Sequence, residues 1–147
     1  MSIASQNERG GAIAALFVRR PVMGVVVNAL IIVAGLAAFF GHLFPMWLGF
    51  KGGKGVATQI GVLFGLFWPL GLIFLGVWIA MAVLFRISSL SALTASALSP
   101  LWAILLGRSD LALPAAIMGI AVYITHRANI ARLFKGEEPR IGKSKTT

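Results

Sequence analysis

Long apolar runs separated by short breaks dominate this sequence. Val22–Phe40 has about the length, ~20 residues, that a helix needs to cross the hydrocarbon core of a bilayer. Leu90–Leu106 and Leu111–Thr125 read in the same way, and a shorter apolar stretch, Ala12–Val18, precedes the first run. The pattern predicts an all-α, polytopic membrane helix bundle with about five transmembrane helices, one of them short.

The run Val56–Phe85 is too long to be a single span. One helix of that length would measure roughly 45 Å at 1.5 Å per residue, against a hydrocarbon core of about 30 Å. The segment Trp68-Pro69-Leu70-Gly71 also interrupts the run. We therefore expect a short helix over Val56–Phe67, followed by a full span over Leu70–Phe85.

The number and positions of the charged residues are typical of a membrane protein and predict its orientation in the bilayer. Only 12% of the residues are charged, whereas soluble domains carry about 25%. The net charge is +9. The main basic regions are the loop with Lys51 and Lys54 and the tail after His126. The positive-inside rule places both in the cytoplasm. Two regions on the same side require an even number of crossings between them, and splitting the long run gives four rather than three.

Composition also limits the chemistry. The basic balance indicates an anionic lipid surface rather than nucleic acid, because no soluble domain remains to bind nucleic acid. The absence of cysteine excludes disulfides, thiol catalysis and thiolate metal sites. The histidines and carboxylates show no recognisable ligand spacing. We expect neither a metal nor a cofactor, and the sequence leaves a protein partner open.

A loop rich in glycine and lysine precedes the short helix. Glycine lets backbone N–H groups approach a ligand closely, and a helix N-terminus with lysine attracts anions, phosphate above all. The loop is not a Walker motif, because no strand precedes it and Gly55 stands where a serine or threonine would hold magnesium. The alternative is an ordinary cytoplasmic turn with positive-inside lysines. The loop residues are Lys51, Gly52, Gly53, Lys54 and Gly55.

A second polar segment follows the last apolar run. If the last span continues as a helix, His126 and Asn129 share a face, and Arg132 extends its basic side. A histidine at the water boundary can exchange a proton with a bound hydroxyl, which Asn129 can orient. The alternative is a basic stop segment with an interfacial histidine. Glu137 and Glu138 are either solvated tail charges or partners that orient lysine or arginine near a phosphate.

Both segments resemble motifs of one family. The sequence GHLFPMWLGFKGGKGVAT, Gly41 to Thr58, resembles the second motif of the bacterial acyl-phosphate:glycerol-3-phosphate acyltransferases (the PlsY family). The sequence HRANIARLFKGEEPRIG, His126 to Gly142, resembles the third motif, with the family glutamate at Glu138. The resemblance covers roughly Gly11 to Gly142. It implies a multi-pass protein of the bacterial inner membrane, with a short helix after the second motif and a cytoplasmic C-terminus.

The resemblance also implies a reaction and roles for residues. An acyl group would pass from acyl phosphate to the 1-hydroxyl of glycerol-3-phosphate, giving lysophosphatidic acid and phosphate. An acyl phosphate is already activated, so no covalent enzyme nucleophile is needed. The implied catalytic residues are His126, Asn129 and Lys54. The implied residues for substrate or phosphate binding are Lys51, Gly52, Gly53, Gly55, Thr58, Arg132 and Glu138. The implied partners are these two small-molecule substrates and membrane lipid.

The N-terminal region departs from the family pattern. The family's first motif, of the form GSGNxGATN, has no match in Met1–Arg20, and Gly11–Arg20 resembles only the end of the family's second span. We therefore expect residues 1–21 to be a polar N-terminus and a remnant of an upstream span, residues 22–142 an acyltransferase-like domain, and residues 143–147 a loose tail. The alternative function is a catalytically inactive, truncated relative that keeps the membrane fold and binds phosphate or lipid.

Overall fold

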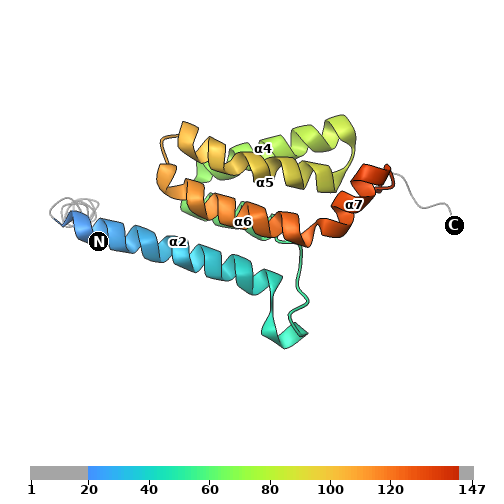
Figure 1. Cartoon of the computed structure of the whole chain (residues 1–147). Helices are drawn as coiled ribbons and strands as arrows, with labels where there is room; N and C mark the ends of the chain where they lie inside the picture. Colours follow the sequence, from blue (N-terminus) through green and yellow to red (C-terminus); the bar gives the residue numbers. More distant parts are fainter. Residues whose placement is uncertain (1–19, 143–147) are drawn as a thin grey trace, which may run out of the picture. The chain divides into compact units, whose positions relative to one another are not determined.

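The computed structural model describes residues 20–142, and all of their regular structure is helical (Figure 1). The predicted all-α class is therefore confirmed. Residues 1–19 and 143–147, which include most of the expected N-terminal remnant and the expected loose tail, lie outside the described part. The elements are α2 (Pro21–Leu43), η1 (Met46–Leu48), α3 (Val56–Leu66), α4 (Trp68–Phe85), α5 (Ser88–Leu105), η2 (Ser109–Leu111), α6 (Ala112–Thr125) and α7 (Arg127–Lys135).

Several of these helices suit a membrane. Helices α2, α4 and α5 are long and apolar enough to cross a bilayer, and α6 with α7 would make a fourth span if the bent pair counts as one. Helix α3 is a shorter apolar helix. The predicted split of the long run is confirmed, since Phe67 takes an extended conformation (φ −162°, ψ 98°) between α3 and α4. Pro69 lies in the first turn of α4, where its missing N–H has no intrahelical partner to lose.

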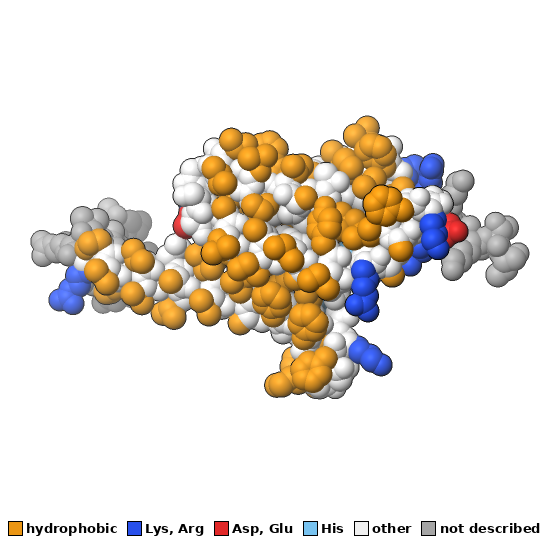
Figure 2. Space-filling model, viewed as in Figure 1, with side chains coloured by type: hydrophobic (Ala, Val, Ile, Leu, Met, Phe, Trp, Pro, Cys, Tyr) orange, Lys and Arg blue, Asp and Glu red, His pale blue; other side chains and the backbone are white. Residues whose placement is uncertain are grey.

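The chain divides into two units, residues 1–34 and residues 35–147. The described part of the first unit is mainly the N-terminal portion of α2, whose apolar side chains such as Val22, Val25 and Leu30 are exposed. Such a surface is the kind that lipid covers. The second unit holds the end of α2 and every later helix. On the visible face of these helices, hydrophobic side chains predominate, and lysines and arginines gather near α7 and the loop that precedes α3 (Figure 2).

Helix α5 is the centre of the second unit. It packs against α4 on one side and against α6 on the other, and α3 packs against α4. Small residues allow the close approach: a Cβ on Gly119 of α6 would lie 3.1 Å from the Ser96 carbonyl oxygen of α5. A buried hydrogen bond of 2.9 Å from Ser96 Oγ to Gln59 Oε1 joins α5 to α3. Neighbouring helices therefore bury the polar side chain of Gln59, which lies in the short helix α3.

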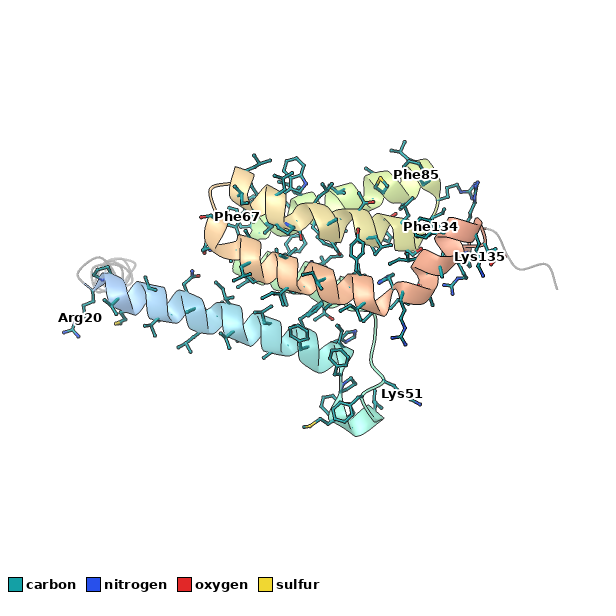
Figure 3. The ribbon with its side chains drawn as sticks, viewed as in Figure 1. Arg20, Lys51, Phe67, Phe85, Phe134 and Lys135 are labelled. Atoms are coloured by element: carbon teal, nitrogen blue, oxygen red, sulfur yellow. The ribbon has the colours of Figure 1, made fainter. Side chains whose placement is uncertain are left out.

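The last span does not continue as a straight helix. Helices α6 and α7 are bent by 64° at His126. The reason lies in composition: α6 is apolar, whereas α7 carries Arg127, Arg132 and Lys135 and favours water. Figure 3 shows Lys135 on α7, beyond this bend. The bend brings α7 into contact with α5. This arrangement shapes the site described below, to which Ser89 at the start of α5 belongs.

Candidate active site

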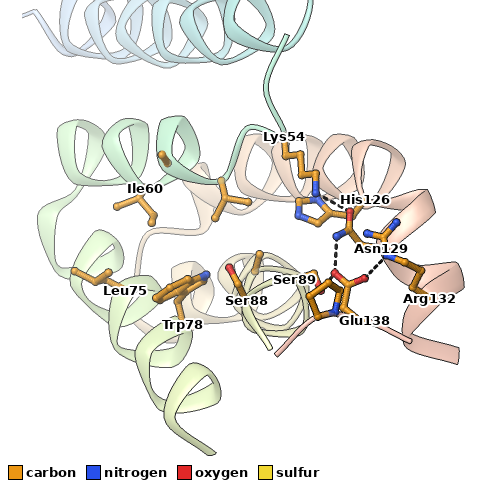
Figure 4. A pocket seen from close by; sticks show the side chains of 14 residues that line it. Lys54, Ile60, Leu75, Trp78, Ser88, Ser89, His126, Asn129, Arg132 and Glu138 are labelled. Atoms are coloured by element: carbon orange, nitrogen blue, oxygen red, sulfur yellow. Dashed lines mark hydrogen bonds and ion pairs between the residues drawn. The ribbon is translucent and has the colours of Figure 1, made fainter. Parts of the chain in front are cut away.

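A pocket of about 630 Å³ opens between α3, α4, α5, the α6–α7 junction and the segment after α7. One end is polar and the other is apolar, as Figure 4 shows, with Lys54, Asn129 and Glu138 on one side and Leu75 and Trp78 on the other. Its polar lining consists of Lys54, Ser88, Ser89, His126, Asn129, Arg132 and Glu138. Its apolar lining consists of Val56, Ala57, Ile60, Leu75, Trp78, Ala92 and Pro139. Such a pocket suits a ligand with a charged head and a hydrocarbon chain.

The Glu138 carboxylate is the centre of the polar end. Its Oε1 accepts hydrogen bonds from Ser89 Oγ at 2.7 Å and from Asn129 Nδ2 at 2.6 Å. Its Oε2 accepts a bond of 2.7 Å from Arg132 Nε, and this ion pair leaves the Glu138 side chain only 6% exposed. One carboxylate thus ties α5, α7 and the segment after α7 together. Of the two alternatives for Glu138, the structure favours the partner of a cation over a solvated tail charge.

Asn129 connects this carboxylate to the glycine-rich loop. Its Oδ1 accepts a hydrogen bond of 2.8 Å from Lys54 Nζ, while its Nδ2 donates to Glu138. The orientation of the amide follows from its partners, because the oxygen faces a cation and the nitrogen faces a carboxylate. Lys54 and Asn129 lie 75 positions apart in the sequence. The network therefore brings together the two segments that the sequence analysis singled out.

His126 lies at the bend, directly after α6, and only 2% of it is exposed. Its Nδ1 lies 2.8 Å from the Val122 carbonyl oxygen. Because a carbonyl only accepts, the neutral ring carries its proton on Nδ1 and leaves the lone pair on Nε2. Burial lowers the pKa of His126; the nearby Lys54 charge lowers it further, and the Val122 carbonyl and Glu138 oppose the change. The ring is therefore neutral at pH 7 and has a nitrogen able to accept a proton.

The loop packs so closely against the C-terminal end of α2 that its glycines leave no room for a side chain. A Cβ on Gly52 would collide with the carbonyl oxygens of His42 and Leu43, and Gly53 lies directly against the His42 ring. Gly55 has φ +85°, a conformation that favours glycine, and is buried under Phe39 and Leu43. The loop is held at its far end by Thr125, whose Oγ1 donates to the Lys54 carbonyl oxygen at 3.0 Å.

The remaining predicted site residues do not all line the same pocket. A second pocket of about 430 Å³ is lined by Lys51, Gly52, Gly53 and Lys54, together with Arg127. Lys54 thus lines both pockets, and Arg132 lines the first. Neither pocket is lined by Gly55 or by Thr58, which is half-buried on α3. Among residues 20–142 no group of three or more histidines and carboxylates could hold a metal ion.

Sequence reasoning missed several contributors to this region, and two of them make hydrogen bonds there. Ser89 was not recognised, although paired hydroxyls directly after a helix break, in Arg86-Ile87-Ser88-Ser89, were an available signal. The second is Arg86, which holds the segment after α7 through both backbone polar groups of Ile141. The Ile141 N–H donates to the Arg86 carbonyl oxygen at 2.6 Å, and Arg86 Nη2 donates to the Ile141 carbonyl oxygen at 3.0 Å. No local pattern announces this contact, since it joins residues 55 positions apart.

The close packing of the glycine-rich loop leads to a stability prediction. We expect Gly52→Ala to lower the free energy of unfolding by about 1–3 kcal/mol, because the added methyl group meets backbone carbonyls rather than flexible side chains. The matched control is Gly61→Ala on α3, where nothing lies within 4 Å of the added Cβ and where alanine favours the helix by about 0.5–1 kcal/mol. Thermal unfolding in detergent micelles measures both variants. Equal melting temperatures for the two variants would contradict the packing described.

The Glu138 network leads to a prediction on acid stability. Burial alone raises the pKa of the Glu138 carboxyl, but the hydrogen bonds from Asn129, Ser89 and Arg132 outweigh it, so that this pKa lies below its usual 4.5. The stabilisation is therefore fully present above about pH 4.5 and is lost as the pH falls through the lower folded-state pKa. Melting temperatures measured from pH 7 downward should fall less steeply in Glu138→Gln than in the parent. Glu137→Gln, at the exposed neighbouring position, should keep the full acid dependence.

Comparison with known proteins identifies the family. A family model described as glycerol-3-phosphate acyltransferase matches residues 10–136. Proteins named glycerol-3-phosphate acyltransferase from Maricaulis maris and Mesorhizobium japonicum are 56% and 58% identical over 115 and 109 residues, which are 78% and 74% of this chain. The protein of that name from Jannaschia sp. is 49% identical over 134 residues, or 91% of this chain. These alignments cover 53%, 56% and 64% of the relatives, so the chain spans only part of their length.

Solved structures agree with the sequence comparison. Two crystal structures of PlsY (YgiH), an integral membrane glycerol 3-phosphate acyltransferase, superpose with TM-scores of 0.69 and 0.68 at 31% sequence identity. One is the glycerol 3-phosphate form and the other the lysophosphatidic acid form. The matches cover 82% of this chain and 72% and 73% of the PlsY chains. The family expected from the two motifs is confirmed, and this chain belongs to the glycerol-3-phosphate acyltransferase family.

Proposed function

We propose that this chain transfers an acyl group from acyl phosphate to the 1-hydroxyl of glycerol-3-phosphate, giving lysophosphatidic acid and phosphate. The observation that carries the proposal is one pocket, between α3, α4, α5 and α7, in which a polar end and an apolar end meet. Both proposed substrates carry phosphate, and one also carries a hydrocarbon chain. The solved PlsY structures in glycerol 3-phosphate and lysophosphatidic acid forms support the same ligands for the family.

The polar end supplies charge for the phosphate groups. Lys54 and Arg132 reach the pocket from opposite sides of Asn129 and Glu138, which hold their side chains in place. Cationic donors fixed at a phosphate stabilise the charge that builds up as the phosphate departs. Each cation is oriented by one hydrogen bond to this network, which reduces the reorganisation needed when the substrate reacts.

The neutral His126 ring would handle the attacking hydroxyl. Its Nε2 can accept the proton of the 1-hydroxyl as the oxygen attacks the acyl carbonyl carbon. The carbon–oxygen bond to phosphate then breaks, and inorganic phosphate leaves with the electron pair. The proton goes either to His126 or to the departing phosphate. In this scheme the donor is already activated, and no covalent acyl-enzyme is formed.

The apolar end would hold the acyl chain. Ile60 of α3 and Leu75 and Trp78 of α4 line it. Ile60 and Trp78 are half-buried. A chain lying along these residues would place its carboxyl carbon toward Lys54 and His126 (Figure 4). The proposed acyltransferase domain comprises residues 22–142.

The test is turnover by the purified 147-residue protein in lipid vesicles. Labelled glycerol-3-phosphate is supplied with palmitoyl phosphate or, separately, with palmitoyl coenzyme A, and lipid product is extracted. We expect lysophosphatidic acid with the acyl phosphate only. Product with the coenzyme A ester alone would overturn the proposed donor. Binding of glycerol-3-phosphate without product from either donor would establish instead the inactive relative that retains only the fold and the binding site.

We also propose that residues 51–55 and the segment after α7 face the cytoplasm of a bacterial inner membrane. The chain contains no cysteine, so a single Lys135→Cys variant reports one position cleanly. A membrane-impermeant maleimide should label this exposed position in inverted membrane vesicles and not in intact spheroplasts. Labelling only in spheroplasts would reverse the proposed orientation.

A further inference from the structure

An exposed apolar cluster precedes the glycine-rich loop. We call it the apolar tip; it consists of Phe44, Met46, Trp47, Leu48 and Phe50. Met46 and Trp47 are 74% and 79% exposed, and Phe50 is 62% exposed. Figure 3 shows the loop that carries the tip, with Lys51 at its edge. Three or more large apolar side chains exposed side by side mark a surface that meets something other than water.

Several backbone N–H groups in and next to the apolar tip donate to carbonyl oxygens of the same loop. The N–H groups of Leu48 and Phe50 both donate to the Pro45 carbonyl oxygen, at 3.1 and 3.0 Å. Gly49 N–H donates to the Met46 carbonyl oxygen at 3.2 Å, and Lys51 N–H to that of Leu48 at 3.2 Å. Proline at 45 has no N–H to satisfy. Because these four N–H groups are paired internally, this part of the backbone leaves water at lower cost, which favours entry into a bilayer.

The conformation also presents the side chains outward. Phe50 has φ +61°, a left-handed conformation that is unfavourable for a bulky residue. Gly49, before it, has φ +58°. The two left-handed residues turn the chain so that the apolar side chains stand outside while residues 51–55 return toward α3. Phe50 thus combines an unfavourable backbone conformation with an exposed side chain.

Two neighbours of the apolar tip indicate its partner. Helix α2 ends at Leu43, and the candidate membrane span that contains it runs on to Leu48, so Met46, Trp47 and Leu48 lie at the end of that span, near a membrane surface. Behind the tip, Phe44 and Phe50 share one pocket with Lys51, Lys54 and Arg127. Tryptophan favours the boundary between headgroups and acyl chains. Adjacent basic residues favour anionic headgroups.

We propose that the apolar tip inserts into the boundary between headgroups and acyl chains of the bilayer, and thereby sets the depth of Lys51 and Lys54 at the level of the lipid phosphates. The partner is the lipid surface itself. This inference does not depend on the proposed reaction, because it concerns only where the loop lies.

Site-directed fluorescence tests the location. A Trp47→Cys variant, labelled with an environment-sensitive fluorophore, is reconstituted in vesicles of phosphatidylethanolamine and phosphatidylglycerol. We expect strong quenching by a lipid carrying a nitroxide near its headgroup and weak quenching by aqueous iodide. Glu137→Cys, on an exposed polar residue, is the control for water, and Ile120→Cys, on an exposed position within α6, is the control for the deep bilayer.

Two results would overturn the proposal. If iodide quenches the label at position 47 as strongly as the label at 137, the tip lies in water. If neither quencher reaches it, the label either lies as deep as the control at position 120 or is covered by another protein surface, such as a second copy of this chain, and in both cases the tip does not lie at the headgroup boundary. Because Trp47 is largely exposed, its replacement removes little packing, and the variant is expected to fold.

A second measurement tests the claim about depth. A label at Lys51→Cys should become more accessible to iodide when Met46 and Trp47 are both replaced by serine, and should stay as in the parent with Trp47→Phe. Unchanged accessibility in the double serine variant would show that the tip does not set the depth of the loop. The readout is independent of turnover.

Discussion

Replacing Lys54 with alanine is expected to lower the turnover of acyl phosphate and glycerol-3-phosphate by about 100-fold or more. The reason is that, in the proposed mechanism, Lys54 supplies a positive charge where phosphate departs, and losing one such donor typically costs about 10²–10³ in rate. The change also leaves Asn129 Oδ1 without the partner that orients it toward Glu138. Initial rates in vesicles, with saturating amounts of both substrates, measure the effect.

The matched control for this loss of charge is Lys135→Ala. Lys135 is exposed at the end of α7 and lines neither of the two pockets, so turnover should stay near the parental value. Lys51→Ala should fall between the two, because Lys51 lines only the second pocket. Parental turnover in Lys54→Ala, with a fully folded protein, would remove Lys54 from the proposed mechanism.

His126→Ala is expected to lower kcat by about 10²–10⁴, the usual contribution of a positioned acid or base. His126 Nε2 has a defined lone pair because Nδ1 is bound to the Val122 carbonyl oxygen. Burial lowers the pKa of His126 below its ordinary 6.5, so the neutral, accepting form persists as the pH falls through 6.5. The acid limb of kcat/KM in the parent should accordingly lie below pH 6.5.

The His126→Asn variant separates two destinations of the proton. Asparagine keeps a polar group near the hydroxyl but does not titrate in this range. If the acid limb disappears together with most of the rate, His126 takes the proton. If the rate is largely kept and only KM rises, the departing phosphate takes it, and His126 positions the hydroxyl. Thermal unfolding of the variant shows whether a loss of rate reflects a loss of folding.

The fold could be predicted well from hydrophobic pattern because membrane spans are constrained in length. The break at Phe67 followed from the excess length of the run and from Trp68-Pro69. The bend at His126 was harder to predict, because a change from apolar to basic residues also occurs where a straight helix simply leaves the membrane. Here the contacts of α7 with α5, far apart in sequence, decide the geometry.

Some members of the candidate site could be predicted from the sequence, but their connections could not. Lys54, His126 and Asn129 stood out because their segments are polar and resemble family motifs. That Glu138 would bind Ser89, Asn129 and Arg132 at once could not be read from the sequence, since it requires α5, α7 and the following segment to converge. The glycines were expected to approach a ligand, whereas the structure shows a second demand: the loop must fit against the end of α2.

The two hydrogen bonds between Arg86 and Ile141 have a consequence for biosynthesis. Of these three residues, translation delivers Lys54 first, Ser89 next and Glu138 last, and domains generally begin to form before the chain is complete. The pocket cannot be finished while only the helices have emerged, because Ile141 must still reach Arg86 at the start of the α4–α5 connection. A chain released by the ribosome before residue 138 would therefore insert its spans, lack the carboxylate that organises Asn129 and Arg132, and occupy the membrane without an assembled site.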